Sequence, residues 1–193
     1  AKCLQRLVRL DLPVPKTVAL SFDAIKGIVS GKLPDLIDIL SNFDKKDTLC
    51  VRPSSESVDW GGPGAVLNIG MNEDRCLHLS KYIGEKAASE LYFRFIQAYS
   101  VSVARLDPDV FDHITGANGN SVSAALEAYK DEMDENFPQS IEHQLSEVLR
   151  SMARAWEGTS ARLLREAKGA PADAGLGLVI QKMAFGVGDG ESG

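Results

Sequence analysis

The sequence predicts an α+β fold that is rich in helix, with a small mixed sheet and a helical subdomain. Four short apolar segments typical of strands lie near the two ends of the chain, at 17–20, 48–52, 65–69 and 176–185. Between them, residues 72–168 show helical periodicity and little strand signal. We therefore expect a sheet-containing lobe made of residues 1–71 and 169–193, and a helical subdomain made of residues 72–168.

Helices are predicted from apolar residues at helical spacing and from the residues that begin them. Ser21 and Asn72 are suitable N-caps, and Pro34 lies in a first turn. Loops rich in glycine and small residues are expected at 115–120 and 169–175. In chain order, the predicted helices lie at 1–11, 22–29, 34–43, 72–82, 85–106, 107–113, 122–133 and 141–157.

Composition limits the classes of function. The 193 residues are 44% hydrophobic and 25% charged, enough for one sizeable domain or two small lobes. The formal net charge is −6 and no basic run is present, which argues against sequence-independent nucleic-acid binding. No apolar run approaches the roughly 18 residues of a membrane span and no signal peptide is visible, so we expect a cytoplasmic protein. The three cysteines are not spaced like metal ligands, and we expect reduced thiols and no metal ligands within this chain.

Residues 50–71 carry the main functional signal. A buried strand delivers Arg52, a permanent cation, to its C-terminal edge, and a loop rich in Ser, Gly and Pro follows. Gly61 and its neighbours allow backbone N–H groups to approach a ligand closely. A cation beside such a loop suits a phosphate group. A solvated hairpin loop that needs Gly and Pro only for its turns explains the same pattern equally well.

Gln181 is the second candidate from the residues themselves. Alternation in the strand at 176–185 divides its side chains between two faces. One face carries Leu178, Ile180, Lys182 and Ala184, and the other carries Gly177, Val179, Gln181 and Met183. From the pattern alone, an ordinary residue of a half-buried strand is the simpler interpretation of Gln181.

These segments resemble the pyruvate phosphate dikinase and phosphoenolpyruvate synthase family. The stretch Val51-Arg52…Gly61…Val66-Leu67-Asn68-Ile69-Gly70 is similar, without a gap, to that family's Val-Arg-Ser-Gly…Pro-Gly…Thr-Val-Leu-Asn-Leu-Gly. The strand around Gln181 is similar to the family's Val-Asn-Val-Gln-Ala-Met-Val-Phe-Gly, and residues 137–139 match its Phe-Pro-Gln. The similarity extends over nearly the whole chain.

The resemblance implies part of an N-terminal, ATP-grasp-like ATP-binding domain. Such a domain clamps ATP with Mg²⁺ and transfers phosphoryl groups to a histidine on a separate domain, which carries them to a barrel domain that handles pyruvate or phosphoenolpyruvate. By this resemblance Arg52 is catalytic, because it neutralises charge on the transferring phosphates. ATP or AMP would be bound by Arg52, Gly61, Ala65 and Gln181, with Gln181 on the base or ribose side.

Departures from the family pattern leave other functions open. An early Lys that contacts phosphates in the family would fall just before Ala1, and the acidic Mg²⁺ ligands lie beyond the end of this chain, so the chain alone is expected to be inactive. The family's second loop Arg is Glu56 here, which would repel phosphates unless it faces away, and its Thr is Ala65. One alternative is a catalytically degenerate nucleotide-binding or regulatory module. Another is a helical interaction module in which Arg52 pairs internally with Glu56 or Asp59.

Overall fold

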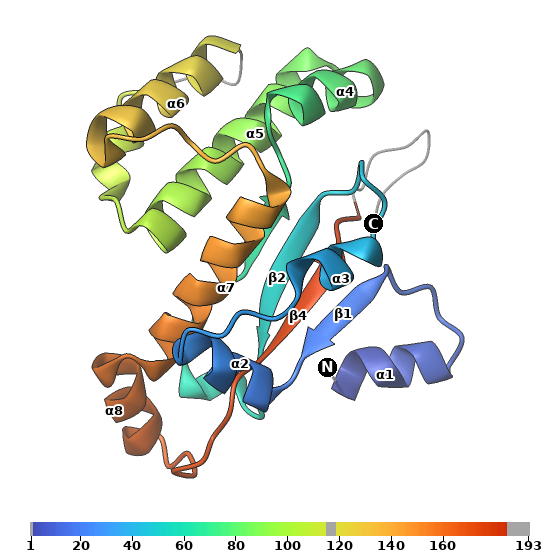
Figure 1. Ribbon diagram of the computed structural model, residues 1–193, viewed down its shortest axis with the longest axis vertical. Helices are drawn as coiled ribbons and strands as arrows, with labels where there is room; N and C mark the ends of the chain where they lie inside the picture. The colour runs from blue at the N-terminus through green and yellow to red at the C-terminus, as the bar shows by residue number, and fades with distance from the viewer. Residues whose placement is uncertain (1, 115–118, 185–193) are drawn as a thin grey trace.

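The four predicted strands form one sheet with the order β1-β4-β2-β3 (Figure 1). The computed structural model describes residues 2–114 and 119–184. The strands are β1 (Thr17–Leu20), β2 (Leu49–Ser54), β3 (Val66–Ile69) and β4 (Gly177–Lys182). The α+β prediction is therefore confirmed. Residues 115–118 of the predicted loop at 115–120 and the end of the chain from residue 185 lie outside the described residues, and Gly119 and Asn120, which were also predicted as loop, begin a helix.

The pairing of the strands differs from the mixed sheet that the sequence predicts. All three pairings are antiparallel, because β4 inserts between β1 and β2 and runs against both. β1 and β2 point the same way, but they are not neighbours. Strand order depends on which distant segment enters the sheet, and no local pattern in the sequence encodes that choice.

Most helices agree with the sequence patterns, but the helix predicted at 34–43 is shorter: Asp35 is its N-cap, so Pro34 lies before the helix and not in its first turn. Ser21 and Asn72 act as the predicted N-caps, and their side-chain oxygens accept hydrogen bonds from the backbone N–H groups of Ala24 and Arg75. The helices are α1 (Lys2–Arg9), α2 (Phe22–Val29), α3 (Leu36–Ser41), α4 (Glu73–Ile83), α5 (Glu85–Tyr99), α6 (Gly119–Met133), α7 (Ile141–Glu157) and α8 (Thr159–Ala167). Short 3₁₀ turns lie at Val58–Trp60 and Pro108–Phe111.

The long helix predicted over residues 85–106 ends earlier than expected. After Tyr99 the backbone forms a π-helical turn, Ser100–Ala104, and Arg105 then adopts a left-handed conformation with φ of 66°. The N–H of Arg105 bonds to the carbonyl of Ser100, which closes the turn. Hydrophobic periodicity does not distinguish such a π-helical turn from the α-helix before it, so the sequence pattern did not predict the change.

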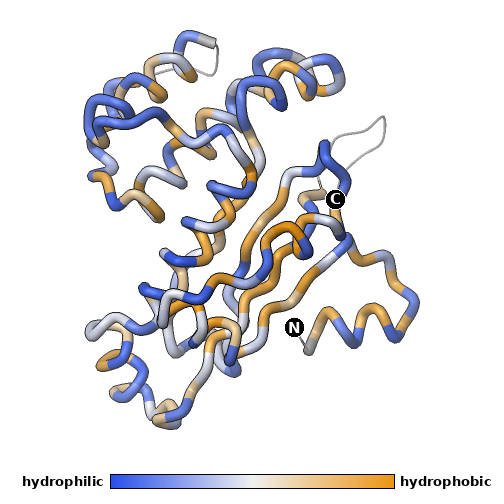
Figure 2. The backbone as a smooth tube through the Cα atoms, in the orientation of Figure 1, coloured by the Kyte–Doolittle hydropathy of each residue, from blue (hydrophilic) through white to orange (hydrophobic). Residues whose placement is uncertain are grey.

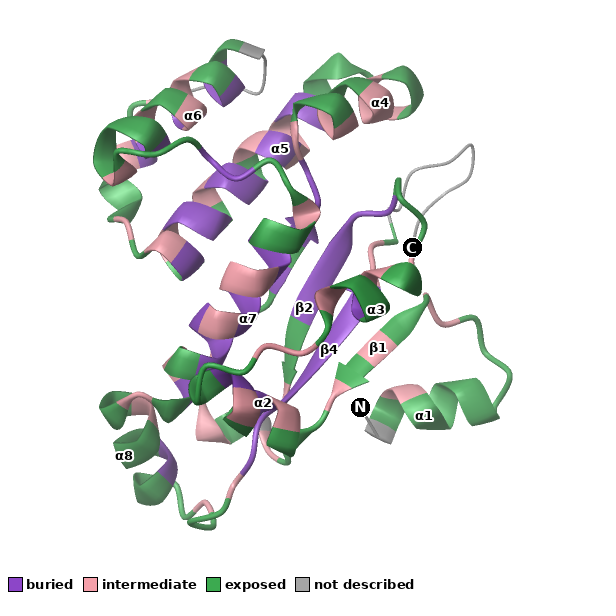
Figure 3. Cartoon of the chain, in the orientation of Figure 1, coloured by how far each residue is buried: buried purple, intermediate pink, exposed green. Residues whose placement is uncertain are grey.

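Helices α2, α3 and α7 pack on one face of the sheet, and α1 lies against the other face beside β1. On β2, Leu49 and Val51 are buried and belong to the main core, where α2, α3 and α7 pack (Figures 1 and 3). Figure 2 shows the corresponding apolar run along the strands. Arg52 alternates with these residues and is exposed. Val179, its partner on β4, is buried but is not part of the main core cluster. We call the side of the sheet that carries Arg52 and Val179 the open face.

A buried glutamine joins the sheet to the helical region. Gln144 of α7 is fully buried, and its Oε1 accepts a 2.7 Å hydrogen bond from the N–H of Gly70, directly after β3. Its Nε2 donates to the carbonyls of Met71 and Pro138 at 3.0 and 2.7 Å. Gly70 has φ of 99°, and a Cβ there would lie 2.9 Å from Cδ1 of Ile141. One side chain therefore bonds three backbone groups, two directly after β3 and one just before α7.

The helical region has its own aromatic core. Phe137 makes edge-to-face contacts with Tyr92, Phe95, Tyr99 and Tyr129, which come from α5 and α6. α7, which lies within the predicted subdomain 72–168, also packs on α2 and α3 of the sheet lobe. The division into two subdomains at these boundaries stays a prediction. Among the described residues, no helix is long and apolar enough to cross a bilayer.

Candidate functional site on the open face of the sheet

Arg52 lies on the open face of the sheet and is exposed. Its register partner is Val179 on β4, and both Arg52 and Cys50 project from the same side of β2. The ion pairs between described residues are Arg94–Glu90, Arg150–Glu147 and Lys182 with Asp44 and Asp47, so Arg52 takes part in none of them. The internal pairing of Arg52 with Glu56 or Asp59 is therefore absent from the part of the chain that the structure describes.

Cys50 is the polar neighbour of Arg52 on β2. The thiol is 3% exposed, and burial raises its pKa, while the positive charge of Arg52 offsets part of that increase. The thiol is therefore protonated at neutral pH and leaves the charge of Arg52 uncompensated. This keeps Arg52 suited to an anionic ligand.

Gln181 lies one step along the same face. It pairs with Cys50 on one side and with Thr17 on the other, and its Nε2 donates a 2.9 Å hydrogen bond to Oγ1 of Thr17. The side chain is almost fully buried and is fixed in orientation by that bond. The fold thus brings Arg52 and Gln181, which are 129 positions apart in the sequence, to adjacent register positions of the open face.

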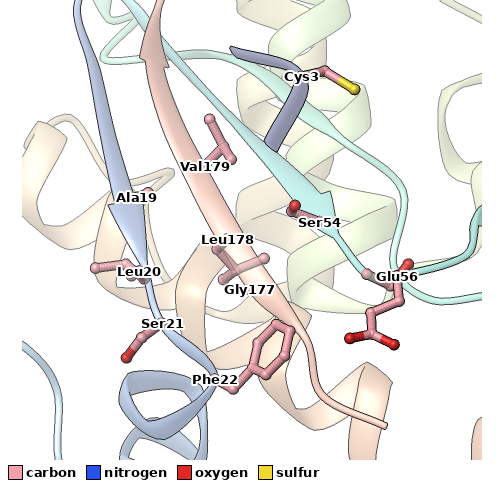
Figure 4. Close-up of a pocket in the computed structure, with 11 residues that line it drawn as sticks. Cys3, Ala19, Leu20, Ser21, Phe22, Ser54, Glu56, Gly177, Leu178 and Val179 are labelled. Atoms are coloured by element: carbon pink, nitrogen blue, oxygen red, sulfur yellow. The ribbon is translucent and has the colours of Figure 1, made fainter. Parts of the chain in front are cut away.

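Two adjoining hollows lie over the open face. The first, which we call the α2 hollow, has a volume of about 710 Å³ and is formed between β1, β2, β4 and the start of α2 (Figure 4). The second, the α1 hollow, has a volume of about 560 Å³ and lies between α1 and β1. Ala19 and Val179 line both, so the hollows meet above the centre of the sheet. Each is within the size range of small-molecule sites.

Charge is distributed unevenly around these hollows. Arg9 and Lys16 line the α1 hollow, and sequence reasoning missed both, because isolated basic residues in a helix and before a strand carry no motif. In the α2 hollow, Ser54 lies two residues after Arg52 on the same strand face, and Glu56 stands at the rim. Phe22 supplies an aromatic wall over Gly177.

The loop that carries Gly61 and Ala65 turns toward the helices. A Cβ on Gly61 would lie 3.1 Å from Cδ2 of Leu164 on α8, and a Cβ on Gly62 would lie 3.3 Å from the Trp156 ring on α7. Both glycines have positive φ, so close packing and backbone conformation together explain them. Ala65 is exposed just before β3. Because Val51 pairs with Val66 in the antiparallel β2–β3 ladder, Ala65 lies beside Arg52, whereas Gly61 packs against α8. The role of Gly61 and Ala65 in binding a nucleotide stays a prediction.

The described residues build no complete metal cage. Among the described residues, no group of three or more His, Cys, Asp and Glu side chains is placed to hold a metal ion. Mg²⁺ does not require such a cage, because it commonly binds through one or two carboxylates together with substrate phosphates and water. The donor set of the α2 hollow, one glutamate beside serine hydroxyls, fits that mode of binding.

Comparison with known proteins gives one consistent relationship. No protein-family model matches the chain. It is 29% identical over 164 residues to pyruvate, phosphate dikinase of Clostridium symbiosum, and 29% identical over 156 residues to the enzyme of Rhizobium meliloti (strain 1021). A third relative, from Rickettsia prowazekii (strain Madrid E), is 25% identical over 159 residues. The chain resembles part of a pyruvate, phosphate dikinase.

The similarity covers most of this chain and a small part of each relative. The matched residues make up 74% of the chain and 19% of the Clostridium symbiosum protein, and 72% of the chain and 17% of the Rhizobium meliloti protein. The matched share of the Rickettsia prowazekii protein is 18%. The resemblance predicted from residues 51–70 and 176–185 is therefore confirmed, at the level of a partial match.

Proposed function

We propose that this chain is the ATP-binding part of a phosphotransferase resembling pyruvate, phosphate dikinase, and that the nucleotide lies on the open face of the sheet. The enzyme would transfer phosphoryl groups from ATP to a histidine on a separate domain. The similarity to proteins named pyruvate, phosphate dikinase supports this reaction class. The observation that carries the proposal is Arg52, an exposed cation without an ion-pair partner among the described residues. Arg52 itself lines neither hollow, but its register partner Val179 lines both, and Ser54, two residues further along β2, lines the α2 hollow.

The order of groups along the face suits an extended nucleotide. Gln181 pairs with Cys50, Arg52 lies two residues further along β2, and Ser54 at the α2 hollow lies two beyond that. Four residues of a strand span about 13 Å. Gln181 would lie on the base or ribose side, Arg52 at the phosphates, and the α2 hollow at the terminal phosphate.

Two basic residues and a helix N-terminus around the face support binding of a polyanion. Arg9 and Lys16 add two cations at the α1 hollow. Ser21 and Phe22 line the α2 hollow at the N-terminus of α2, where the helix dipole is positive. Mg²⁺, when bound with ATP, would neutralise phosphate charge; the residues of this chain would position and screen the phosphates.

The test is calorimetric titration of the chain with Mg·ATP and with AMP. An arginine–phosphate hydrogen bond between charged groups contributes about 1.5–3 kcal/mol, so Arg52→Ala should weaken ATP binding by roughly 10- to 150-fold. Arg94→Ala is the matched control, because Arg94 is exposed on α5 and pairs only with Glu90 among the described residues. Equal affinity of Arg52→Ala and the wild type for Mg·ATP would exclude the proposed placement.

A degenerate site that binds nucleotide without transferring phosphoryl groups is the second candidate. It is favoured by Glu56, whose carboxylate stands at the rim of the α2 hollow, where a second cation would be expected to assist transfer. The gene product that contains this chain, supplied with ATP, inorganic phosphate and pyruvate, separates the two. Formation of phosphoenolpyruvate supports the phosphotransferase, and tight Mg·ATP binding without product supports the degenerate module.

A further inference from the structure

Two linked hydrogen bonds fix the orientation of the Gln181 amide. The hydroxyl of Thr17 donates a 2.7 Å hydrogen bond to the carbonyl of Pro15, and Oγ1 of Thr17 accepts a 2.9 Å hydrogen bond from Nε2 of Gln181. A threonine hydroxyl has one proton to donate. Because Pro15 takes that proton, Thr17 can only accept from Gln181. The amide nitrogen of Gln181, and not its oxygen, therefore faces Thr17.

The amide oxygen is the atom that this arrangement leaves for a ligand. The hydrogen bonds between described residues include none to Oε1 of Gln181, and Oε1 is not one of the buried side-chain atoms that lack a partner there. Gln181 itself lines neither hollow. Its register partner Thr17 and its neighbour Val179, two residues away on β4, both line the α1 hollow, so Gln181 lies at the edge of that hollow. A side chain fixed in this way offers an acceptor and no donor.

We infer that Thr17 is a positioning residue that holds Gln181 with Oε1 toward the 6-amino group of adenine, and that this contact selects ATP over GTP. The inference rests on the proposed function, which places Gln181 on the base or ribose side of the nucleotide. Adenine carries an N–H donor at position 6, whereas guanine carries a carbonyl oxygen there. A fixed acceptor opposite this position bonds to adenine and repels guanine.

The selectivity depends on Thr17 because a glutamine amide by itself does not discriminate. An amide that is free to flip presents its oxygen to adenine or its nitrogen to the carbonyl oxygen of guanine. Thr17→Val keeps the size and branching of the side chain and removes the hydroxyl, which releases the amide. Since Thr17 is exposed on β1, this substitution opens no cavity in the core. Thr17→Ser keeps the hydroxyl and should keep the amide in place.

The experiment is calorimetric titration of wild type, Thr17→Val and Thr17→Ser with the Mg²⁺ complexes of ATP, GTP and inosine triphosphate. Wild type should bind ATP at least roughly 30-fold more tightly than GTP, because a fixed polar group discriminates against a base that lacks its partner. In Thr17→Val the ratio should fall to about threefold, and in Thr17→Ser it should stay above roughly tenfold. Inosine triphosphate has the position-6 carbonyl of GTP without the 2-amino group, so wild type should bind it as weakly as GTP.

The ratio of affinities separates positioning from a structural role, because damage to the fold would weaken the binding of both nucleotides together. An equal ATP-to-GTP ratio in Thr17→Val and wild type overturns the role of Thr17 and leaves the proposed function standing. Inosine triphosphate bound as tightly as ATP by wild type overturns the contact with the 6-amino group. Absence of binding of all three nucleotides to wild type refutes the proposed function and the inference together.

Discussion

Replacing Gln144 by Ala should cost this protein more stability than any other single polar substitution outside the site. The amide is fully buried and bonds to Gly70 N–H, Met71 C=O and Pro138 C=O over 2.7–3.0 Å. Truncation leaves three buried backbone groups without their partner, and each unsatisfied group costs about 1–3 kcal/mol. Partial hydration of the new space lowers the sum, so we expect a loss of about 3–5 kcal/mol. A domain of this kind has a total of about 5–15 kcal/mol.

Urea unfolding at 25 °C, followed by tryptophan fluorescence and circular dichroism, measures this loss. The midpoint should fall with little change in slope, because the surface exposed on unfolding is nearly the same. Gln97→Ala is the control, since Gln97 is a partly exposed glutamine of α5, and it should change stability by less than about 1 kcal/mol. A loss below about 1 kcal/mol for Gln144→Ala would refute the argument that this side chain joins the sheet to the helices.

Two further predictions concern packing and pH. Gly62→Ala should destabilise the loop by about 1–3 kcal/mol and alter the fluorescence of Trp156, because φ at Gly62 is 141° and the new methyl would lie 3.3 Å from the indole; Gly64→Ala, where no atom lies within 4 Å, is the control. Burial raises the pKa of Tyr92 and of Tyr129 to about 12 from the usual value near 10. Since the unfolded chain loses these protons first, stability should be intact below pH 10 and fall between pH 10 and 12 by about 1.4 kcal/mol per pH unit for each tyrosine. Denaturant midpoints that stay constant over that range, measured with absorbance at 295 nm, would contradict the burial of these rings.

Local chemistry made much of the fold predictable. The N-caps Ser21 and Asn72 and the alternation around Gln181 act over a few residues, and the structure follows them. The order of the strands could not be predicted in this way, because β4 pairs with β1 across the whole helical region: Leu178, the partner of Leu20, lies 158 residues later in the chain. Such a pairing joins segments that are distant in the sequence, so no local pattern predicts it.

The candidate site shows the same limit. Arg52 and Gln181 were recognisable because each lies in a segment with a strand pattern and a family resemblance, and the fold places them on one face. The role of Gln144 could not be predicted, because a glutamine in an amphipathic helix is usually a surface residue and two of its three backbone partners lie 73 and 74 positions away. The sequence predicts that Gly61 binds a ligand, and the structure shows in addition that Leu164 packs against Gly61.

The account depends most on where a nucleotide binds. Amide chemical shifts of the ¹⁵N-labelled chain, titrated with Mg·ATP, locate the site without assuming activity. We predict shift changes confined to β1, β2 and β4 and to the starts of α1 and α2, with the largest around Arg52, Ser54 and Glu56. The same titration of Arg52→Ala should reduce them. Changes confined to α4, α5 and α6, or none at millimolar Mg·ATP, would contradict the placement of the nucleotide on the open face.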